Sequence, residues 1–111
     1  MTSMPEELSP TSFRARWPDE HLDEVQLLDV REPQELAIVS LPSALHIPMR
    51  EIPGRLAELD RDRPIVVMCH TGVRSRHVAG FLLANDFEHI YNLAGGIDAW
   101  SAEVDPTLPR Y

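Results

Sequence analysis

The chain has one cysteine, Cys69, among its 111 residues. A single cysteine excludes an internal disulfide, so we expect a reducing compartment, the cytoplasm, as the protein's setting. Long apolar runs are also missing. Stretches such as Ile65–Met68 and Phe81–Ala84 suit a buried core and are far too short to cross a bilayer. The opening segment Met1–Glu7 is acidic and has no apolar export region. These absences predict a cytoplasmic protein without a membrane partner.

Positive charge is scarce as well. Ten Lys and Arg residues stand against 18 Asp and Glu residues, which gives a formal net charge of -8 at pH 7. Nucleic acids and anionic membranes are bound through clusters of basic side chains. We therefore expect neither as a partner. A small anion can still bind where a local positive site works against the overall field.

What is present suits an ordinary globular protein. The length fits a single domain over residues 1–111, and 43% of the residues are apolar, enough to close a core. We expect that core to run from about residue 9 to residue 104, and the tail from Asp105 to Tyr111 to be irregular. The chain shows no internal repeat and no low-complexity segment.

Short apolar runs alternate with helical patterns along the chain. The runs expected to form strands are Val25–Val30, Ala44–Ile47, Ile65–Cys69 and Ile90–Leu93. The expected helical segments are Pro10–Trp17, Glu32–Glu35, an amphipathic helix carrying Ile52, Leu56 and Leu59, then Ser75–Asn85 and Ile97–Glu103. Strands that alternate with helices predict an α/β fold with a parallel sheet covered on both faces.

The segment from Met68 to Ser75 lies where the strongest predicted strand ends and the best predicted helix begins. In an open α/β sheet, ligands bind beyond the carboxyl ends of the strands. The backbone amides of a tight loop that enters a helix attract an anion, and Gly72 lets the backbone turn there. A cysteine in this position meets those amides, the helix dipole and Arg74, all of which favour the thiolate. This predicts Cys69 as a nucleophile.

The substrate-binding and persulfide-binding loop would then consist of His70, Thr71, Gly72, Val73, Arg74 and Ser75. A lone cysteine at the end of a strand is often only a small buried hydrophobic residue. The Gly, Arg and Ser that follow Cys69 at a strand-to-helix junction favour the reactive interpretation.

Four motifs in the right order and spacing resemble the rhodanese-like domain family over nearly the whole chain. They are Leu27–Glu32, Ala44–Pro48, Cys69–Ser75 and Gly95–Trp100. The resemblance implies a three-layer fold with a central parallel sheet of four or five strands flanked by helices. It also implies a sulfurtransferase of the thiosulfate type. Cys69 would take sulfane sulfur from a small anionic donor such as thiosulfate, hold it as a persulfide and pass it to cyanide, a thiol or a sulfur-carrier protein. This chemistry requires no metal and no organic cofactor.

One segment departs from the family pattern. Before the second predicted strand the family commonly has Gly-His-Ile-x-Gly-Ala, whereas this chain has Val39–Ala44 without the glycines and the histidine. We expect a different local backbone there and an altered rim of the pocket. The cysteine loop itself is unaffected.

Residues near the loop have two interpretations each. Arg74 either binds the sulfonate of the donor or points to solvent beside the mouth, and His70 either helps to hold an anionic donor or faces water. Asp29 and Arg31 end a strand on the same side of the sheet as Cys69, so they are candidate supporting residues. A structural ion pair or a loop hydrogen bond is the commoner role for such residues. Thiosulfate is favoured over 3-mercaptopyruvate, since Arg74 stands where that subgroup tends to carry a smaller neutral residue.

Three other functions fit the sequence less well. A phosphatase or arsenate reductase loop has an arginine six positions after the cysteine, where this chain has Ser75. Rhodanese-like domains can be non-catalytic binding modules when their cysteine is missing, and here Cys69 is present. A metal site built from Cys69, His70 and His77 matches no zinc-ligand spacing.

Overall fold

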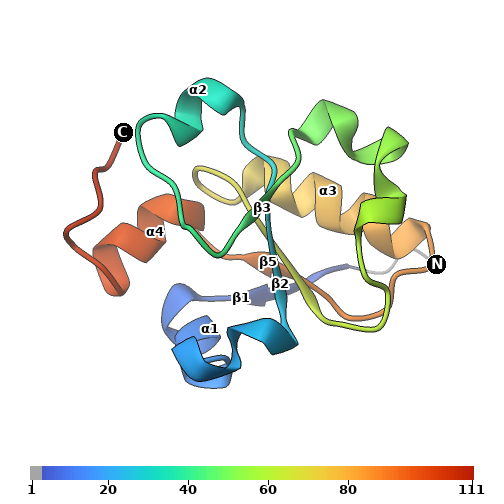
Figure 1. Cartoon of the computed structure of the whole chain (residues 1–111), viewed down its shortest axis with the longest axis horizontal. Helices are drawn as coiled ribbons and strands as arrows, with labels where there is room; N and C mark the ends of the chain where they lie inside the picture. Colours follow the sequence, from blue (N-terminus) through green and yellow to red (C-terminus); the bar gives the residue numbers. More distant parts are fainter. Residues whose placement is uncertain (1–3) are drawn as a thin grey trace.

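The computed structural model describes residues 4–111. One sheet runs through it in the order β1-β5-β4-β2-β3, and every neighbouring pair is parallel. Its strands are β1 (Glu6–Leu8), β2 (Gln26–Asp29), β3 (Leu45–His46), β4 (Ile65–Met68) and β5 (Ile90–Leu93). The α-helices are α1 (Pro10–Arg16), α2 (Pro33–Leu36), α3 (Val73–Ala84) and α4 (Gly96–Glu103). The 3-10 helices are η1 (Asp19–Glu24), η2 (Met49–Gly54) and η3 (Leu56–Glu58). The α/β fold with a parallel sheet agrees with the sequence prediction (Figure 1).

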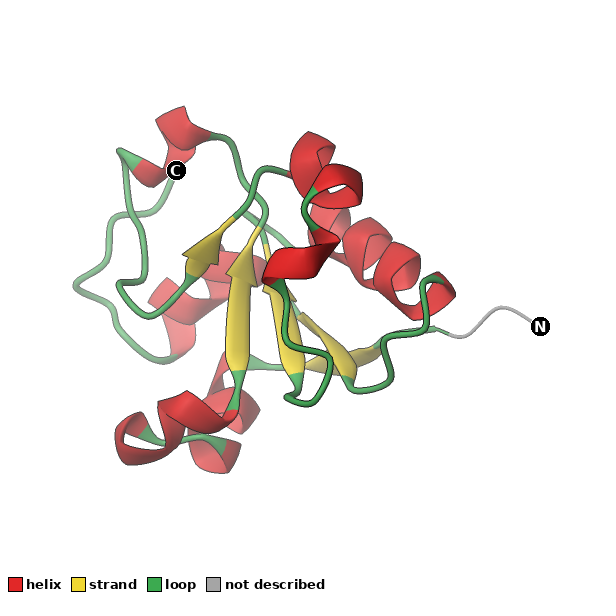
Figure 2. Cartoon of the chain, turned by 45° about the vertical axis from the view of Figure 1, so that its right-hand side comes forward, coloured by secondary structure: helices red, strands yellow, loops and turns green. Residues whose placement is uncertain are grey.

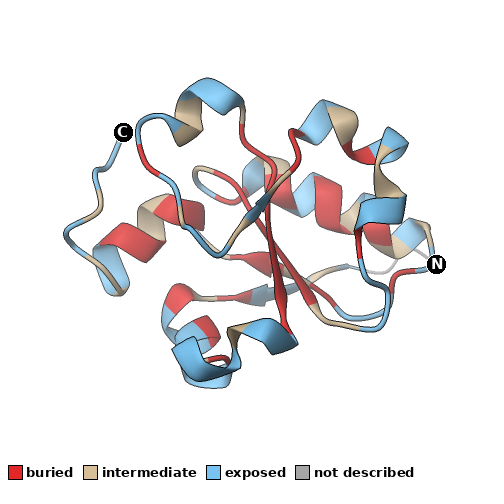
Figure 3. Cartoon of the chain, viewed as in Figure 1, coloured by how far each residue is buried: buried red, intermediate tan, exposed pale blue. Residues whose placement is uncertain are grey.

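Each face of the sheet packs its own apolar cluster, because successive side chains of a strand point to opposite faces. In β4, Ile65 and Val67 join the cluster that includes residues of α3 and η2, while Val66 and Met68 join the cluster of α1 and α4. All four side chains are fully buried. The sheet lies between helices, and its middle is buried (Figures 2 and 3). Because β4 is buried on both faces, its sequence is one continuous apolar run.

Local signals set the helix ends well. The hydroxyl of Ser9 accepts a hydrogen bond from the backbone N–H of Ser12, and Pro10 occupies the first helical position of α1. Helix α3 begins at Val73, two residues before the predicted start, with Gly72 as its N-cap.

Among the helices of residues 4–111, none combines the length and the apolar character that a membrane span requires.

Two parts of the secondary structure differ from the prediction. Strand β1 was not expected, since Glu6–Leu8 has no apolar run, and it forms by pairing with β5. The predicted amphipathic helix around Ile52–Leu59 is wrong: η2 and η3 occupy this stretch. Pro53 lies inside η2 and has no backbone N–H to donate, so an α-helix cannot continue through it.

Candidate active site

Cys69 directly follows β4 and is almost completely buried, with 1% of its surface exposed. Its Sγ accepts hydrogen bonds from the backbone N–H of Gly72 at 3.1 Å and of Ser75 at 3.4 Å. Ser75 lies in the first turn of α3, and the N-cap Gly72 has no side chain that could bind the free amides of that turn. The sulfur therefore rests at the positive end of a helix, an arrangement that favours an anion.

The carbonyl groups of the loop are held by the next helix. The backbone N–H of Ile97 donates to the carbonyl of Cys69 at 2.9 Å, and that of Asp98 donates to the carbonyl of His70 at 3.1 Å. Gly96 has a φ of 61°, and a Cβ atom there would lie 2.4 Å from both of these carbonyl oxygens. Helix α4 can approach the loop this closely only because the residue at its start is glycine.

Asn92 of β5 binds two residues of the loop through its side chain. It was not identified from the sequence. This buried side chain donates to the carbonyl of Gly72 at 3.0 Å and accepts a hydrogen bond from the hydroxyl of Ser75. It also donates to the carboxylate of Glu7 in β1. The available signal was a polar residue in the middle of an otherwise apolar strand. The side chain of Ser75 thus positions the loop, while its amide contacts the sulfur.

Arg74 forms an ion pair with Glu35 of α2, an arrangement that the sequence did not indicate. The two terminal nitrogens of Arg74 donate to the two carboxylate oxygens of Glu35 at 2.6 and 2.8 Å. These hydrogen bonds lower the pKa of Glu35 from 4.5 to about 2, and the carboxylate in turn raises the pKa of Arg74. The positive charge of Arg74 in the cysteine loop is therefore compensated by a carboxylate of α2.

Asp29 and Arg31 form a buried ion pair at the carboxyl end of β2, with both side chains 0% exposed. Arg31 donates to both oxygens of Asp29, with its shortest contact at 2.7 Å, and to the carbonyl of Val39 at 2.8 Å. Burial opposes the charge of Arg31, but its hydrogen bonds to Asp29 and Tyr111 outweigh this effect and raise its pKa. The pair lies beside the loop, since the N–H of Val30 donates to the carbonyl of Met68 at 3.0 Å.

The exposed side of the loop carries His70, Thr71 and Val73. Thr71 and Val73 face solvent. The ring of Tyr111 stacks on the ring of His70, with centroids 3.8 Å apart and planes 7° from parallel. His70 is half-buried beneath it, and its Nε2 has no hydrogen-bond partner within residues 4–111. The structure thus places His70 under an aromatic cover that the sequence did not reveal.

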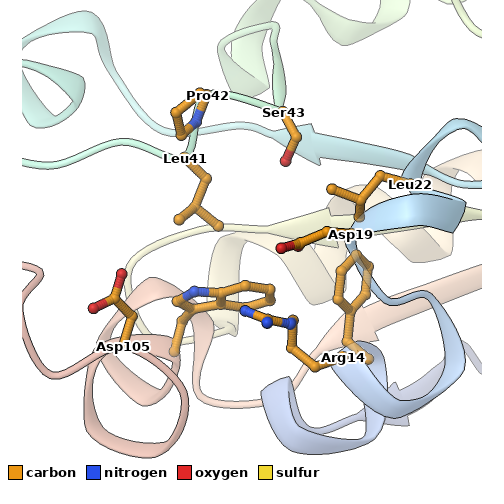
Figure 4. A pocket seen from close by; sticks show the side chains of 9 residues that line it. Arg14, Asp19, Leu22, Leu41, Pro42, Ser43 and Asp105 are labelled. Atoms are coloured by element: carbon orange, nitrogen blue, oxygen red, sulfur yellow. The ribbon is translucent and has the colours of Figure 1, made fainter.

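Part of the segment Val39–Ala44, which departs from the family pattern, lines a cavity away from Cys69. Its first residue, Val39, accepts a hydrogen bond from Arg31 beside the cysteine loop, while Leu41, Pro42 and Ser43 line a separate cavity of about 290 Å³. None of the predicted site residues lines this cavity (Figure 4). Its other lining residues come from α1, η1, α4 and the tail: Phe13, Arg14, Asp19, Leu22, Trp100 and Asp105.

Among residues 4–111 no cluster of three or more His, Cys, Asp or Glu side chains is arranged to hold a metal ion.

Comparison with known proteins places the chain in a family. Residues 14–103 match the rhodanese-like domain. A sulfurtransferase of Allochromatium vinosum is 37% identical over 105 residues, which cover 95% of this chain and 96% of that protein. The rhodanese-like/PpiC domain-containing protein 12, chloroplastic, of Arabidopsis thaliana is 42% identical over 94 residues, covering 81% of this chain and 31% of that longer protein.

The solved structures agree. A rhodanese-like domain protein from Staphylococcus aureus superposes with a TM-score of 0.79 at 29% identity, covering 96% of this chain and 98% of that one. Its likeness extends over the five-stranded parallel sheet and the helices on both faces. The chain belongs to the rhodanese-like domain family.

Proposed function

We propose that this protein is a sulfurtransferase that carries sulfane sulfur on Cys69 as a persulfide. The observation behind the proposal is the Sγ of a buried cysteine that accepts hydrogen bonds from two backbone amides at the start of α3. Amides aimed at a sulfur stabilise a thiolate and the terminal sulfur of a persulfide alike. The family and the sulfurtransferase among its relatives support the same activity.

This geometry supports a first half-reaction with thiosulfate as the donor. The Cys69 thiolate attacks the outer sulfur of thiosulfate, a sulfur–sulfur bond to Cys69 forms, and the sulfur–sulfur bond of the donor breaks. Sulfite leaves with the electron pair of that bond, so no oxidant or reductant is consumed. The backbone amides of the loop His70–Ser75 would stabilise the negative charge on the sulfur before and after the transfer.

In the second half-reaction a nucleophile attacks the outer sulfur of the persulfide and releases the Cys69 thiolate. Cyanide, a thiol or the thiol group of a sulfur-carrier protein has the required chemistry. Neither half-reaction uses a metal or an organic cofactor. A lone cysteine suits a reducing compartment such as the cytoplasm. Because the chain has no second cysteine, no thiol of its own competes for the persulfide.

Arg74 is the proposed contact for the sulfonate group of the donor. Its guanidinium is held by Glu35, and 35% of the Arg74 side chain is accessible to solvent. A sulfonate would share or replace the carboxylate of Glu35 as its partner. Asp29 and Arg31 would support the site from the end of β2, where their buried ion pair lets Arg31 bind the carbonyl of Val39 and the hydroxyl of Tyr111.

Intact-mass measurement tests the proposal. The purified protein is incubated with thiosulfate, and its mass should rise by one sulfur atom and return to the original value with dithiothreitol or cyanide. Cys69→Ser is the control and should gain no mass. An unchanged mass of the parent protein, together with hydrolysis of p-nitrophenyl phosphate, would favour a phosphatase and overturn the assignment.

A further inference from the structure

The segment after α4 is attached to the body of the protein at several points. The hydroxyl of Ser101 donates to the carbonyl of Leu108 at 2.7 Å, and Leu108 packs against the cluster of α1 and α4. Arg110 pairs with Asp98 at 2.9 Å. These contacts lead the chain back toward the cysteine loop, and its end lies beside α2 in both views of the molecule (Figures 1 and 2).

Tyr111 joins the cysteine loop to the segment that runs from the end of β2 into α2. Its ring lies flat on His70, the residue next to Cys69 in the loop. Its hydroxyl donates to a carboxylate oxygen of Glu35 at 2.7 Å and accepts a hydrogen bond from Arg31 at 3.0 Å. Glu35 and Arg31 belong to the β2–α2 side of the site, and His70 belongs to the loop. One side chain therefore bridges the two segments that border the nucleophile.

Elsewhere the loop is contacted by residues of the sheet and of helix α4. Asn92 of β5 and Gly96 of α4 contact its backbone directly. Cys69 is 1% exposed with all these parts in place. Tyr111 differs from them because it lies on the surface, with 38% of the residue accessible, and belongs to neither apolar cluster. Displacing its ring therefore breaks the stack on His70 and two hydrogen bonds, and no contact within the apolar clusters.

We propose that Tyr111 is a specificity-determining residue of the sulfur-transfer site. With its ring on His70, small reagents reach Cys69, whereas a bulky thiol or a protein acceptor reaches it only after the ring moves away. The inference rests on the proposed function for its meaning in sulfur transfer. The accessibility of Cys69 can be measured independently of that function.

Alkylation rates provide the test, because the only cysteine of the chain is Cys69. The full chain is treated with a small reagent, iodoacetamide, and with a bulky one, fluorescein maleimide, and adducts are counted by mass, with Cys69→Ser as the blank. In Tyr111→Ala the ratio of the bulky to the small rate should rise roughly three- to tenfold, the range expected for loss of an aromatic stack. Tyr111→Phe keeps the stack on His70 but loses the hydrogen bonds of the hydroxyl to Glu35 and Arg31, so its ratio should lie between those of the parent and Tyr111→Ala.

Phe81→Ala is the matched control. Phe81 is an aromatic residue with 37% exposure, close to the 38% of Tyr111, and it lies near the far end of α3 from the loop. Its truncation should leave the ratio unchanged. Tyr111→Leu, which keeps bulk but cannot stack, is a second variant that should also raise the ratio. Circular dichroism confirms folding for each protein.

The transfer arm uses protein already loaded with sulfur. Release of sulfur to cyanide should change little in Tyr111→Ala, and release to glutathione should accelerate by about the same factor as the bulky alkylation. An unchanged alkylation ratio, or equal acceleration with both reagents, would overturn the role of Tyr111. A parent protein that never forms a persulfide would instead overturn the proposed function, and the alkylation result would still stand.

Discussion

At the scale of single residues, Cys69 and its immediate contacts carry the proposed chemistry. The sulfur has two backbone donors and no side-chain base bonded to it within residues 4–111. Activation then depends on the loop amides and on nearby positive charge rather than on a proton-accepting histidine. This arrangement suits a nucleophile that holds an anionic sulfur between two half-reactions.

Replacing this sulfur should remove the activity and leave the fold. Cys69→Ser is nearly isosteric, and its hydroxyl can accept the same amide hydrogen bonds but cannot form a persulfide. We expect thiosulfate-to-cyanide transfer at background level and a thermal unfolding midpoint close to that of the parent. Transfer that survives in Cys69→Ser would show that another group is the nucleophile.

The ion pair of Arg74 with Glu35 predicts opposite effects of two substitutions. Arg74→Ala should raise the KM for thiosulfate about several-fold, since a partly exposed charge contact contributes on the order of 1 kcal/mol. Glu35→Gln should lower that KM, because Arg74 is released from its carboxylate. Added salt should shrink both differences by screening.

Steady-state kinetics at low and high salt measure this pair of effects. Arg61→Ala is the control, since this arginine contacts the carbonyl of Asn85 and the ring of Phe87, away from the loop. Equal KM values for the parent and Arg74→Ala at low salt would mean that the backbone alone binds the donor.

At the scale of elements, the loop is shaped by the close approach of α4. Backbone amides at the start of α4 donate to the carbonyls of Cys69 and His70. These two carbonyl groups lie so close to Gly96 that no side chain fits at that position. A central parallel strand, a tight loop and two helix N-termini thus meet at one place. The site depends on backbone positions that side-chain chemistry alone would not indicate.

Two glycine-to-alanine substitutions distinguish the effect of the close α4–loop contact from the effect of helix propensity. Gly96→Ala places a Cβ 2.4 Å from two carbonyl oxygens at a φ of 61°. It should destabilise the fold by roughly 1–3 kcal/mol and displace the loop, so we expect transfer to fall by about tenfold or more. Gly80→Ala, inside α3 with open space around it, should instead stabilise the protein by about 0.5–1 kcal/mol.

Urea unfolding and steady-state kinetics of both variants check this comparison. Gly80→Ala should keep the parent's activity, which makes it the control for a glycine-to-alanine change in a helix. Parent-like stability and kinetics in Gly96→Ala would show that α4 can move away from the loop without consequence.

At the scale of the whole molecule, the ion pair of Glu35 and Arg74 links stability to pH. The folded protein lowers the pKa of Glu35 from 4.5 to about 2, chiefly through Arg74. As the pH falls, the unfolded chain takes up this proton first, so the folded state loses its advantage between those two values. The stabilising contribution of Glu35 is complete above about pH 5 and absent below about pH 2.

Glu35→Gln should therefore be less stable than the parent at neutral pH and converge with it in acid. Unfolding free energies from urea titrations of both proteins between about pH 7 and pH 2 measure the difference. Glu88→Gln, at an exposed position before β5, serves as the control for loss of one negative charge. A difference that stays constant over this range would contradict the link between Glu35 and folding.

Much of the architecture was predictable because the signals are local. The four predicted strands and the start of α1 follow from contiguous apolar runs, a Ser-Pro cap and nearby breakers. Strand β1 was missed because two of its three residues are exposed glutamates. Its strand geometry comes from hydrogen bonds to β5, whose sequence is more than eighty residues away. The helix predicted around Ile52–Leu59 failed at Pro53.

By itself, the sequence determined the strand, turn and helix around Cys69, since residues 68–75 are contiguous and glycine permits the turn. The tertiary structure alone decided what borders that loop. Sheet order brings β2, β4 and β5 side by side, which sets Glu35 against Arg74 and Asn92 beneath Gly72. The return of the last segment lays Tyr111 on His70. Such contacts join residues 20 to 41 positions apart, and no periodicity or motif encodes which distant side chains will meet.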